Sequence, residues 1–284
     1  MHPVLLKIGW FQLRSYGLFL LLALLAGLAW AHHEFQRRRL PIDFLADCML
    51  VLIPVGAIGA RLLYVVLNLN EFVKEPLSAF ALWSGGLSLF GALITGIASI
   101  AILARRRQLD FWEVGDASAP AYLLAYAIGR IGCFFNGCCI GYPTNLPWAI
   151  RFHDPLTLKI GPPSHPVPLY SAIGSFILFA IVLKLRGRVR ITGQLMLWTL
   201  MLHLSWRFAM EFFRKGATAK ELAFGLTEAQ VACIIGIIAL AWIHQWRLHQ
   251  AIASAKMQRA TKAKSKVRSP RRKQRKGREA SKRP

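Results

Sequence analysis

The sequence predicts an all-α polytopic membrane protein with seven transmembrane helices, and three observations support this fold class. The composition is apolar: 55% of the 284 residues are hydrophobic, 17% are charged, and the mean hydropathy is +0.41, which is too apolar for an ordinary soluble domain. Apolar runs long enough to cross a bilayer recur along the chain, and the number of basic residues alternates between the loops that join them. The seven runs are residues 16–33, 44–68, 85–104, 114–135, 168–184, 193–213 and 228–246.

The first run, 16–33, is predicted to be a retained transmembrane helix. Lys7 and Arg14 precede it, but no convincing small-residue cleavage site of a signal peptide follows it. Several of the later runs contain Gly or Pro, which membrane helices tolerate when neighbouring groups satisfy the backbone. We therefore expect every run to form a helix, with ends defined to within about four residues.

Basic residues cluster after every second run, and this pattern predicts the orientation. The loops in between have fewer Lys and Arg, and acidic residues offset part of their charge. Because basic loops stay in the cytoplasm, the N-terminus is predicted to lie outside and the C-terminus in the cytoplasm, as an odd number of spans requires. The basic clusters are residues 37–39, 105–107 and 184–190 and the tail that follows the last run.

Two regions follow from this organisation: a seven-helix membrane domain, residues 1–250, and a basic cytoplasmic tail, residues 251–284. From residue 256 onward the chain has fourteen Lys or Arg and one acid, Glu279, with almost no large apolar side chains. Such a segment is predicted to be disordered. It could bind anionic lipids or act as a nucleic-acid arm. Because it directly follows a membrane helix, we expect anionic lipids as its partner and no nucleic acid.

The predicted topology gathers polar side chains at the outer membrane face, because the runs that carry most of them lead outward or open there. The outer loop, about 137–167, contains six prolines and should form an irregular but ordered cap over this face. Asp116 is instead expected near the cytoplasmic end of its run. The outer set consists of Tyr16, Arg61, Arg130, Arg207, Glu211 and Arg214.

The segment from Gly129 to Gly141 places an arginine, Arg130, at the end of an apolar run. An arginine in the middle of a membrane helix costs about 2.5–3.5 kcal/mol, so Arg130 needs an anionic partner. The glycines on either side, Gly129 and Gly132, leave room for another backbone or a ligand. The segment therefore predicts a membrane-embedded anion site.

Arg207, Glu211 and Arg214 are spaced i, i+4 and i+7, so on a helix they fall within about 40° of one another. Glu211 could pair with either arginine and orient its planar fork, which suits bidentate phosphate binding. The alternative is an ion-pair ladder that only joins helices. Because the outer arginines exceed the acids near them, a phospholipid headgroup is the predicted anion.

These motifs resemble those of the bacterial prolipoprotein diacylglyceryl transferase family. The resemblance extends over the seven runs and stops at the basic tail. Each motif is short, but their order, spacing and shared membrane side make the set specific. The motifs are Gly129-Arg130-Ile131-Gly132 with Phe134, Asn136 and Gly141; Trp83-Ser84-Gly85-Gly86; Arg207-Phe208 with Glu211 and Arg214; and, more weakly, Tyr16-Gly17, Gly59-Ala60-Arg61 and His165-Pro166 with Leu169-Tyr170.

The resemblance implies a reaction in the bacterial cytoplasmic (inner) membrane, with the active site toward the periplasmic face. A diacylglyceryl group would move from phosphatidylglycerol to the lipobox cysteine thiol of a preprolipoprotein, which starts lipoprotein maturation, and glycerol phosphate would be released. No metal and no diffusible cofactor are implied.

The same resemblance assigns roles to the residues. Arg207, Glu211 and Tyr16 are the expected catalytic residues. Arg207 stabilises the leaving phosphate, Glu211 orients the Arg207 guanidinium, and Tyr16 supplies a hydrogen bond. Arg130 is expected to bind the phosphatidylglycerol headgroup. The other residues expected to bind phosphatidylglycerol are Asn136, Gly141, Arg61, Arg214, Gly85 and Gly86.

The sequence departs from the family pattern where a proton acceptor is expected. Phe90 stands where the family often has histidine, and Cys133 and Cys138 replace an asparagine and an acid. His203 or His165 could act as the base, or the arginines alone could favour the thiolate. The alternative function is a divergent relative that binds phospholipid, or performs a related transfer, without acylating prolipoproteins. A transporter is disfavoured because the charges lie toward one face and no inverted repeat is evident.

Cys133, Cys138 and Cys139 form a cluster that faces an oxidising compartment. A disulfide between Cys133 and one of the other two would tighten the loop around the arginine site. Free packing residues, a thiol that carries an acyl group and a metal site are the alternatives, although no histidine at zinc-finger spacing accompanies the thiols. Cys48 and Cys233 lie in separate runs and are predicted to be packing residues.

Overall fold

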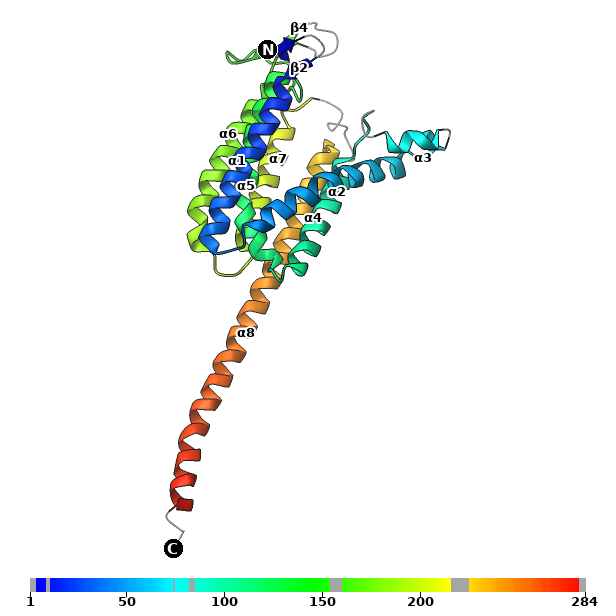
Figure 1. Ribbon diagram of the computed structural model, residues 1–284. Helices are drawn as coiled ribbons and strands as arrows, with labels where there is room; N and C mark the ends of the chain where they lie inside the picture. Colours follow the sequence, from blue (N-terminus) through cyan, green and yellow to red (C-terminus); the bar gives the residue numbers. More distant parts are fainter. Residues whose placement is uncertain are drawn as a thin grey trace.

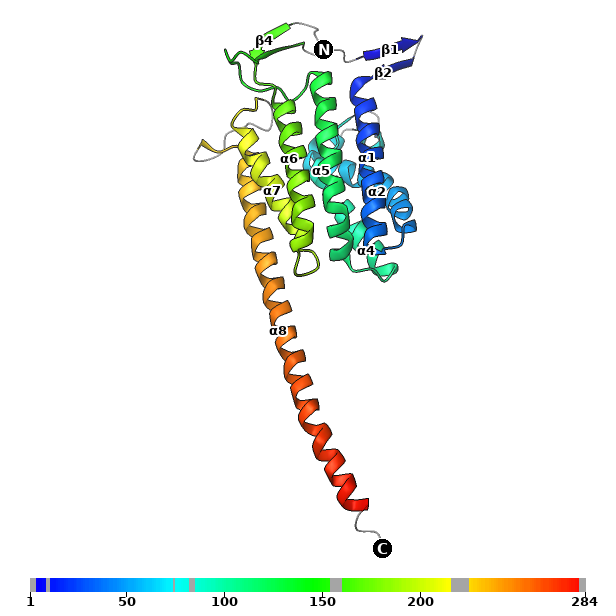
Figure 2. The same cartoon turned by 90° about the vertical axis from the view of Figure 1, so that its left-hand side faces the viewer.

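The chain forms a bundle of long helices with two small hairpins at one end (Figures 1 and 2). This computed structural model describes residues 4–8, 11–73, 75–81, 85–153, 160–215 and 225–280. Trp83 and Ser84, which open the predicted glycine motif, lie outside the described residues.

Each predicted run coincides with a helix. By length and composition, five helices of the described chain could cross a membrane: α1 (Ser15–Arg38), α2 (Asp43–Leu67), α5 (Phe111–Asn136), α6 (Val167–Leu185) with the short η3 (Arg186–Arg188), and α8 (Glu228–Ala280). Two more, α4 (Leu89–Arg106) and α7 (Gln194–Glu211), have 18 residues each and lie in the same bundle (Figure 2). The short α3 (Leu69–Phe72) and η1 (Pro76–Phe80) follow α2. The predicted helical, polytopic membrane architecture is confirmed.

The helix α4 begins four residues later than the predicted run 85–104. Gly85 and Gly86 have φ angles of 84° and 68°, left-handed values that glycine adopts without strain and that interrupt a helix. The glycine pair therefore forms a turn before α4.

The helix α5 occupies the centre of the bundle, where it packs against α1, α6 and α7, while α2 pairs with α4 and α7 with α8. Leu123 of α5, Val182 of α6 and Leu195 of α7 are fully buried in one core where these three helices meet. This central position brings the last turns of α5 close to both α1 and α7.

Two antiparallel hairpins correct the all-α prediction. The first pairs β1 (Val4–Ile8) with β2 (Phe11–Arg14). The second pairs β3 (Ile150–His153) with β4 (Ile160–Ser164) inside the outer loop that was predicted to be irregular. Phe152 explains the attachment of this second hairpin, because it is buried and its ring meets that of Phe134 near the end of α5.

The last helix continues into the basic tail. The helix α8 runs from Glu228 through Ala280. Its many Ala, Lys, Arg and Gln residues are good helix formers, so the helix propagates beyond its apolar part. Figure 1 shows this part of α8, in orange to red, extending away from the other helices.

Paired charges hold one end of the bundle together. Glu34, fully buried near the end of α1, forms ion pairs with Arg37 at 2.8 Å and with Arg186 of η3 at 2.5 Å. Asp116 of α5 accepts hydrogen bonds from two backbone N–H groups at the start of α7. The ends of α1, α4 and α6, which precede the basic clusters, lie together here, opposite the hairpins (Figure 2).

Candidate functional site

A cavity of about 780 Å³ lies between α1 and α5, with one wall completed by Ile53 of α2. Tyr16 from the first turn of α1 and Arg130 from the last turns of α5 supply its polar groups, together with Tyr126. Leu20 and Leu24 of α1 are among its apolar wall residues. A cavity with a cation and hydroxyl groups beside an apolar wall suits an amphipathic ligand.

Arg130 is held by an aromatic partner from its own helix. Its guanidinium donates a hydrogen bond to the Tyr126 hydroxyl, one turn earlier, and lies 4.7 Å from the centre of the Tyr126 ring. Among the described residues, no carboxylate oxygen lies within ion-pair distance of Arg130. The positive charge is thus positioned but not neutralised, as a site for an external anion requires.

Tyr126 and Tyr122 belong to the site but were not among the residues predicted from the sequence. The His203 ring of α7 packs edge-on against both, at centroid distances of 4.5 Å and 5.2 Å. The spacing of Tyr122, Tyr126 and Arg130 by four residues was the available signal, because it places them along one helix face.

His203 lies between the two arginines of the candidate site. It is buried, and it is close enough to Arg130 and Arg207 to interact electrostatically with both. Its Nδ1 has no hydrogen-bond partner among the described residues. The ring therefore connects the Arg130 side of α5 with the Arg207 side of α7.

Arg207 and Glu211 of α7 form the ion pair that their i, i+4 spacing predicts. The Glu211 side chain is fully buried, and 17% of the Arg207 side chain is exposed. One carboxylate oxygen of Glu211 accepts a hydrogen bond from the Arg207 guanidinium, whereas the other has no hydrogen-bond partner in the described part of the chain. The pair fixes the guanidinium and leaves an acceptor oxygen unused.

The structure corrects the prediction that Arg214 shares one helix face with Arg207 and Glu211. The helix α7 ends at Glu211, so Arg214 leaves the helix face and forms a short bridge with Gly141. Its guanidinium lies 3.4 Å from the Cys139 sulfur. Arg214 therefore faces the cysteine cluster, and Glu211 pairs with Arg207.

Gly141 joins two parts of the outer loop to the segment that follows α7. Its N–H donates to the His165 carbonyl at 3.0 Å. A Cβ at this position would lie 2.5 Å from the Phe213 carbonyl oxygen and 2.6 Å from the His165 Cβ, which is too close for any side chain. The His165 ring packs against Tyr170 and Phe213. Gly141 and His165 thus shape the loop behind the site.

Arg61 is not brought to the Arg130 cavity. It is buried, and it donates hydrogen bonds to the carbonyl oxygens of Ser78, Ala79, Gly85 and Gly86, at 2.5–3.1 Å. Its side chain lines a separate cavity of about 270 Å³ beside α2. Because its donors are occupied by backbone oxygens, Arg61 holds the segment before α4 in place. The carbonyl oxygens of Gly85 and Gly86 are among its acceptors.

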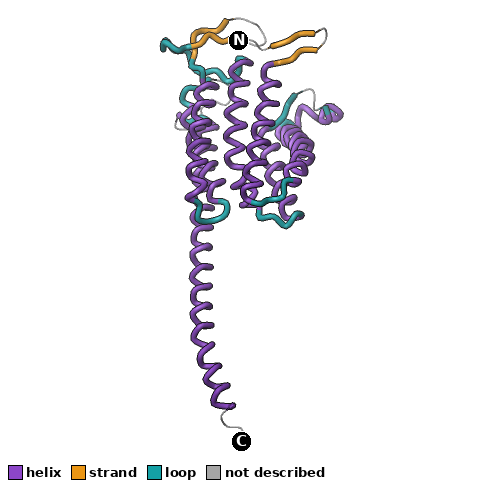
Figure 3. Tube along the Cα trace, turned by 60° about the vertical axis from the view of Figure 1, so that its left-hand side comes forward, coloured by secondary structure: helices purple, strands orange, loops and turns teal. Residues whose placement is uncertain are grey.

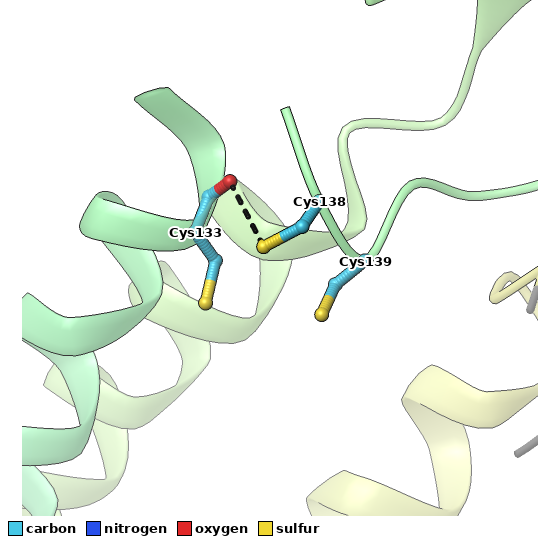
Figure 4. Close-up of side chains that lie close together, drawn as sticks. All are labelled: Cys133, Cys138 and Cys139. Atoms are coloured by element: carbon cyan, nitrogen blue, oxygen red, sulfur yellow. Dashed lines mark hydrogen bonds between the residues drawn. The ribbon is translucent and has the colours of Figure 1, made fainter. Parts of the chain in front are cut away.

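Cys133, Cys138 and Cys139 meet where α5 ends, and their three sulfur atoms all lie within 4.8 Å of one another (Figure 4). The Cys138 thiol lies 3.6 Å from the Cys133 carbonyl oxygen, to which it donates, and the Asn136 side chain is hydrogen-bonded to the same thiol. All five cysteines fall within the described residues, and each is a free thiol in this structure.

Cys139 has a left-handed backbone conformation and a lowered thiol pKa. Its φ angle of 60° is a left-handed value that is rare for residues other than glycine. Hydrogen bonding from the thiols of Cys133 and Cys138, together with the nearby charges of Arg214 and Arg130, lowers the Cys139 pKa below its ordinary value. The cluster thus places the Cys139 sulfur beside cations that favour its thiolate form.

The fold and the site define a polytopic helical membrane protein with a cationic, partly apolar cavity. The family model described as "Prolipoprotein diacylglyceryl transferase" matches residues 3–246. The chain belongs to this family, as its motifs predicted.

Curated relatives agree with this assignment. The phosphatidylglycerol–prolipoprotein diacylglyceryl transferase of Trichormus variabilis is 34% identical over 261 residues, covering 85% of this chain and 89% of the relative. The enzyme of the same name from Halalkalibacterium halodurans is 32% identical over 262 residues, covering 88% of each chain. The one from Synechocystis is 37% identical over 186 residues, covering 64% of this chain and 66% of the relative.

Proposed function

We propose that this protein transfers the diacylglyceryl group of phosphatidylglycerol to the lipobox cysteine of a preprolipoprotein. A carbon–sulfur bond forms, the carbon–oxygen bond to phosphate breaks, and glycerol phosphate leaves. The observation that carries this proposal is the Arg130 guanidinium, which borders an apolar cavity and has no carboxylate partner among the described residues. Membership of the transferase family supports the same reaction.

The cavity suggests how phosphatidylglycerol binds. Its phosphate lies at Arg130, the Tyr16 hydroxyl donates a hydrogen bond to the headgroup, and the acyl chains follow the wall formed by Leu20, Leu24 and Ile53. A guanidinium fork is the side-chain group that best matches two phosphate oxygens. Positioning the headgroup here places the reacting glycerol carbon at the polar end of the cavity.

Arg207 is assigned to the charge that develops on the leaving phosphate. Its ion pair with Glu211 holds the guanidinium in one orientation, which avoids reorganisation during the reaction. Asn136, Gly141 and Arg214 shape the loop beside this region. Arg61, with its donors on backbone oxygens, supports the fold of the neighbouring segment.

The proposed topology has seven spans, with α4 and α7 added to the five longer apolar helices. The ends of α1, α4 and α6, together with the extension of α8, are assigned to the cytoplasm because basic segments follow them. The hairpins and the Arg130 cavity are then assigned to the periplasmic face of the bacterial cytoplasmic membrane. This is the side on which secreted preprolipoproteins present their lipobox. We assign the basic extension of α8 to anionic lipids, and assign it no nucleic acid.

A transfer assay tests the proposal. Purified protein is mixed with headgroup-radiolabelled phosphatidylglycerol and a lipobox peptide, and both the lipidated peptide and the released glycerol phosphate are measured. The expected result is equal formation of the two products with the cysteine peptide and neither product with the matched serine peptide. Phosphatidylglycerol binding without transfer would instead support the divergent relative, in which Phe90 replaces the usual histidine.

A further inference from the structure

The turn after α5 brings three sulfur atoms together. The helix ends at Asn136, Gly137 adopts a left-handed conformation with φ 72°, and Cys139 follows with φ 60°. These two left-handed residues turn the chain back, so that Cys138 and Cys139 approach Cys133 on the last turn of the helix (Figure 4).

The dimensions of the cluster match a tetrahedral zinc site after a small contraction. A Zn–S bond of about 2.3 Å in tetrahedral geometry separates neighbouring sulfur atoms by about 3.8 Å. The three sulfur atoms lie within 4.8 Å of one another, and side-chain rotation of the two loop cysteines can supply the difference. Three protein ligands leave one coordination position open, the arrangement found in catalytic zinc sites.

The surroundings favour a thiolate-rich centre with negative charge. Three thiolates and a divalent cation carry a net charge of −1. The Arg214 guanidinium lies 3.4 Å from the Cys139 sulfur, where it can offset that charge. Arg130 is close enough to Cys133 and Cys139 to interact with them electrostatically. Cys133 also lines the cavity that contains Arg130 and Tyr16.

We propose that Cys133, Cys138 and Cys139 bind one thiophilic divalent cation of the zinc class, and that its open position takes the thiol of the substrate cysteine. This inference rests on the proposed function and deepens it, because it names the group that activates the nucleophile. Coordination to such a cation deprotonates a thiol outright and is an established way to activate a nucleophile.

The chemistry balances without a redox step. The substrate thiol binds the cation and releases its proton to water. A sulfur lone pair then attacks the glycerol carbon, and the electron pair of the breaking carbon–oxygen bond goes to the phosphate beside Arg130. The product is a neutral thioether, a weaker ligand than a thiolate, so it leaves the cation. Neither His203 nor His165 is needed as a base.

Metal analysis of the purified full-length protein is the direct test. Wild-type protein should hold about one zinc per chain, and the Cys133→Ser, Cys138→Ser and Cys139→Ser variants less than about a tenth of that. Cys48→Ala, which alters a buried cysteine of α2 outside the cluster, should retain the full amount. Cobalt substitution should give sulfur-to-metal charge-transfer bands that change with the lipobox peptide and not with its serine form.

The transfer assay separates this inference from the proposed function. Chelator-treated protein should lose transfer while it still binds phosphatidylglycerol, and Zn²⁺ but not Mg²⁺ should restore transfer. Full transfer by metal-free protein would overturn the metal site and leave the proposed function intact. Alkylation of all five thiols in freshly purified protein, or a disulfide within the cluster, would also overturn it. Bound zinc without transfer under any condition would refute the proposed function and the substrate role, while the cysteine ligands would stand.

Discussion

The two ends of the helix bundle differ in whether their buried charged side chains have partners. At the end where α1 and α6 finish, Glu34 has two arginine partners and Asp116 receives two backbone N–H groups. At the other end, Arg130 has a tyrosine in place of a carboxylate, and one buried oxygen of Glu211 lacks a partner in the described part of the chain. Charges that neutralise one another stabilise the fold. Charges left over are available to a ligand.

The largest loss of transfer activity should follow from removing the Arg130 guanidinium, which has no carboxylate partner among the described residues. Arg130→Ala should lower transfer by about 10²–10³-fold, as expected for loss of a preorganised charge at a developing anion. Initial rates with labelled phosphatidylglycerol measure this. Arg107→Ala at the opposite end is the matched control, because Arg107 is half exposed and paired with Asp47. It should stay within about twofold of wild type. Equal losses in both variants would contradict the comparison.

The buried carboxylates give a second contrast. Glu211→Gln should lower transfer by about 10- to 100-fold, because Arg207 loses the partner that orients it. Glu34→Gln should instead lower the free energy of unfolding by about 1–3 kcal/mol, because a charged hydrogen bond to a buried group is lost. Its specific activity should be unchanged. Thermal unfolding in detergent and rates per folded protein separate the two effects, and a Glu34→Gln protein with normal stability would refute the structural role.

The pH dependence of Cys139 alkylation tests whether the charges at the Arg130 end of the bundle stabilise a thiolate. Its pKa is lowered, so its thiolate persists as the pH falls. After metal removal, its alkylation rate should be nearly constant between about pH 8 and pH 6, whereas a thiol of ordinary pKa slows about tenfold per pH unit. Mass spectrometry of quenched samples measures the rate at this residue. Arg214→Ala should increase the pH dependence. Ordinary pH dependence in the wild-type protein would show that the thiols and arginines do not stabilise the thiolate.

The smallest effect is expected at His203. A phenyl ring can keep the edge-on contacts with Tyr122 and Tyr126, so His203→Phe should change transfer by less than about threefold. An essential general base would contribute about 10²–10⁴-fold. A loss of that size, with a shifted pH profile, would identify His203 as the proton acceptor and argue against activation by a metal.

Local patterns in the sequence were sufficient for much of the site. The ion pair of Arg207 with Glu211 follows from i, i+4 geometry, and the position of Arg130 at the end of α5 follows from the length of an apolar run. Both are set within one helix. The motifs also identified the family.

Features set by tertiary contacts were not predicted. Arg214 was placed on the helix face because the sequence does not reveal that α7 ends at Glu211. Arg61 was assigned to the lipid because its backbone acceptors are 17 to 25 residues away in the chain. The sequence predicted the cysteine cluster but not its turn, which depends on two left-handed residues, Gly137 and Cys139, of which only the glycine is a recognisable signal.

The length of α8 sets how far its positive charge reaches. At about 1.5 Å per residue, the 53 residues of α8 form a rod of about 80 Å, more than twice the hydrocarbon thickness of a bilayer, about 30 Å. Ionic screening limits the pull of a charged membrane surface to about 8 Å, or roughly five or six residues of straight helix. In the proposed topology, a perpendicular α8 would therefore present most of its basic residues to the cell interior. It has to bend or lie flat before they can attach to lipid.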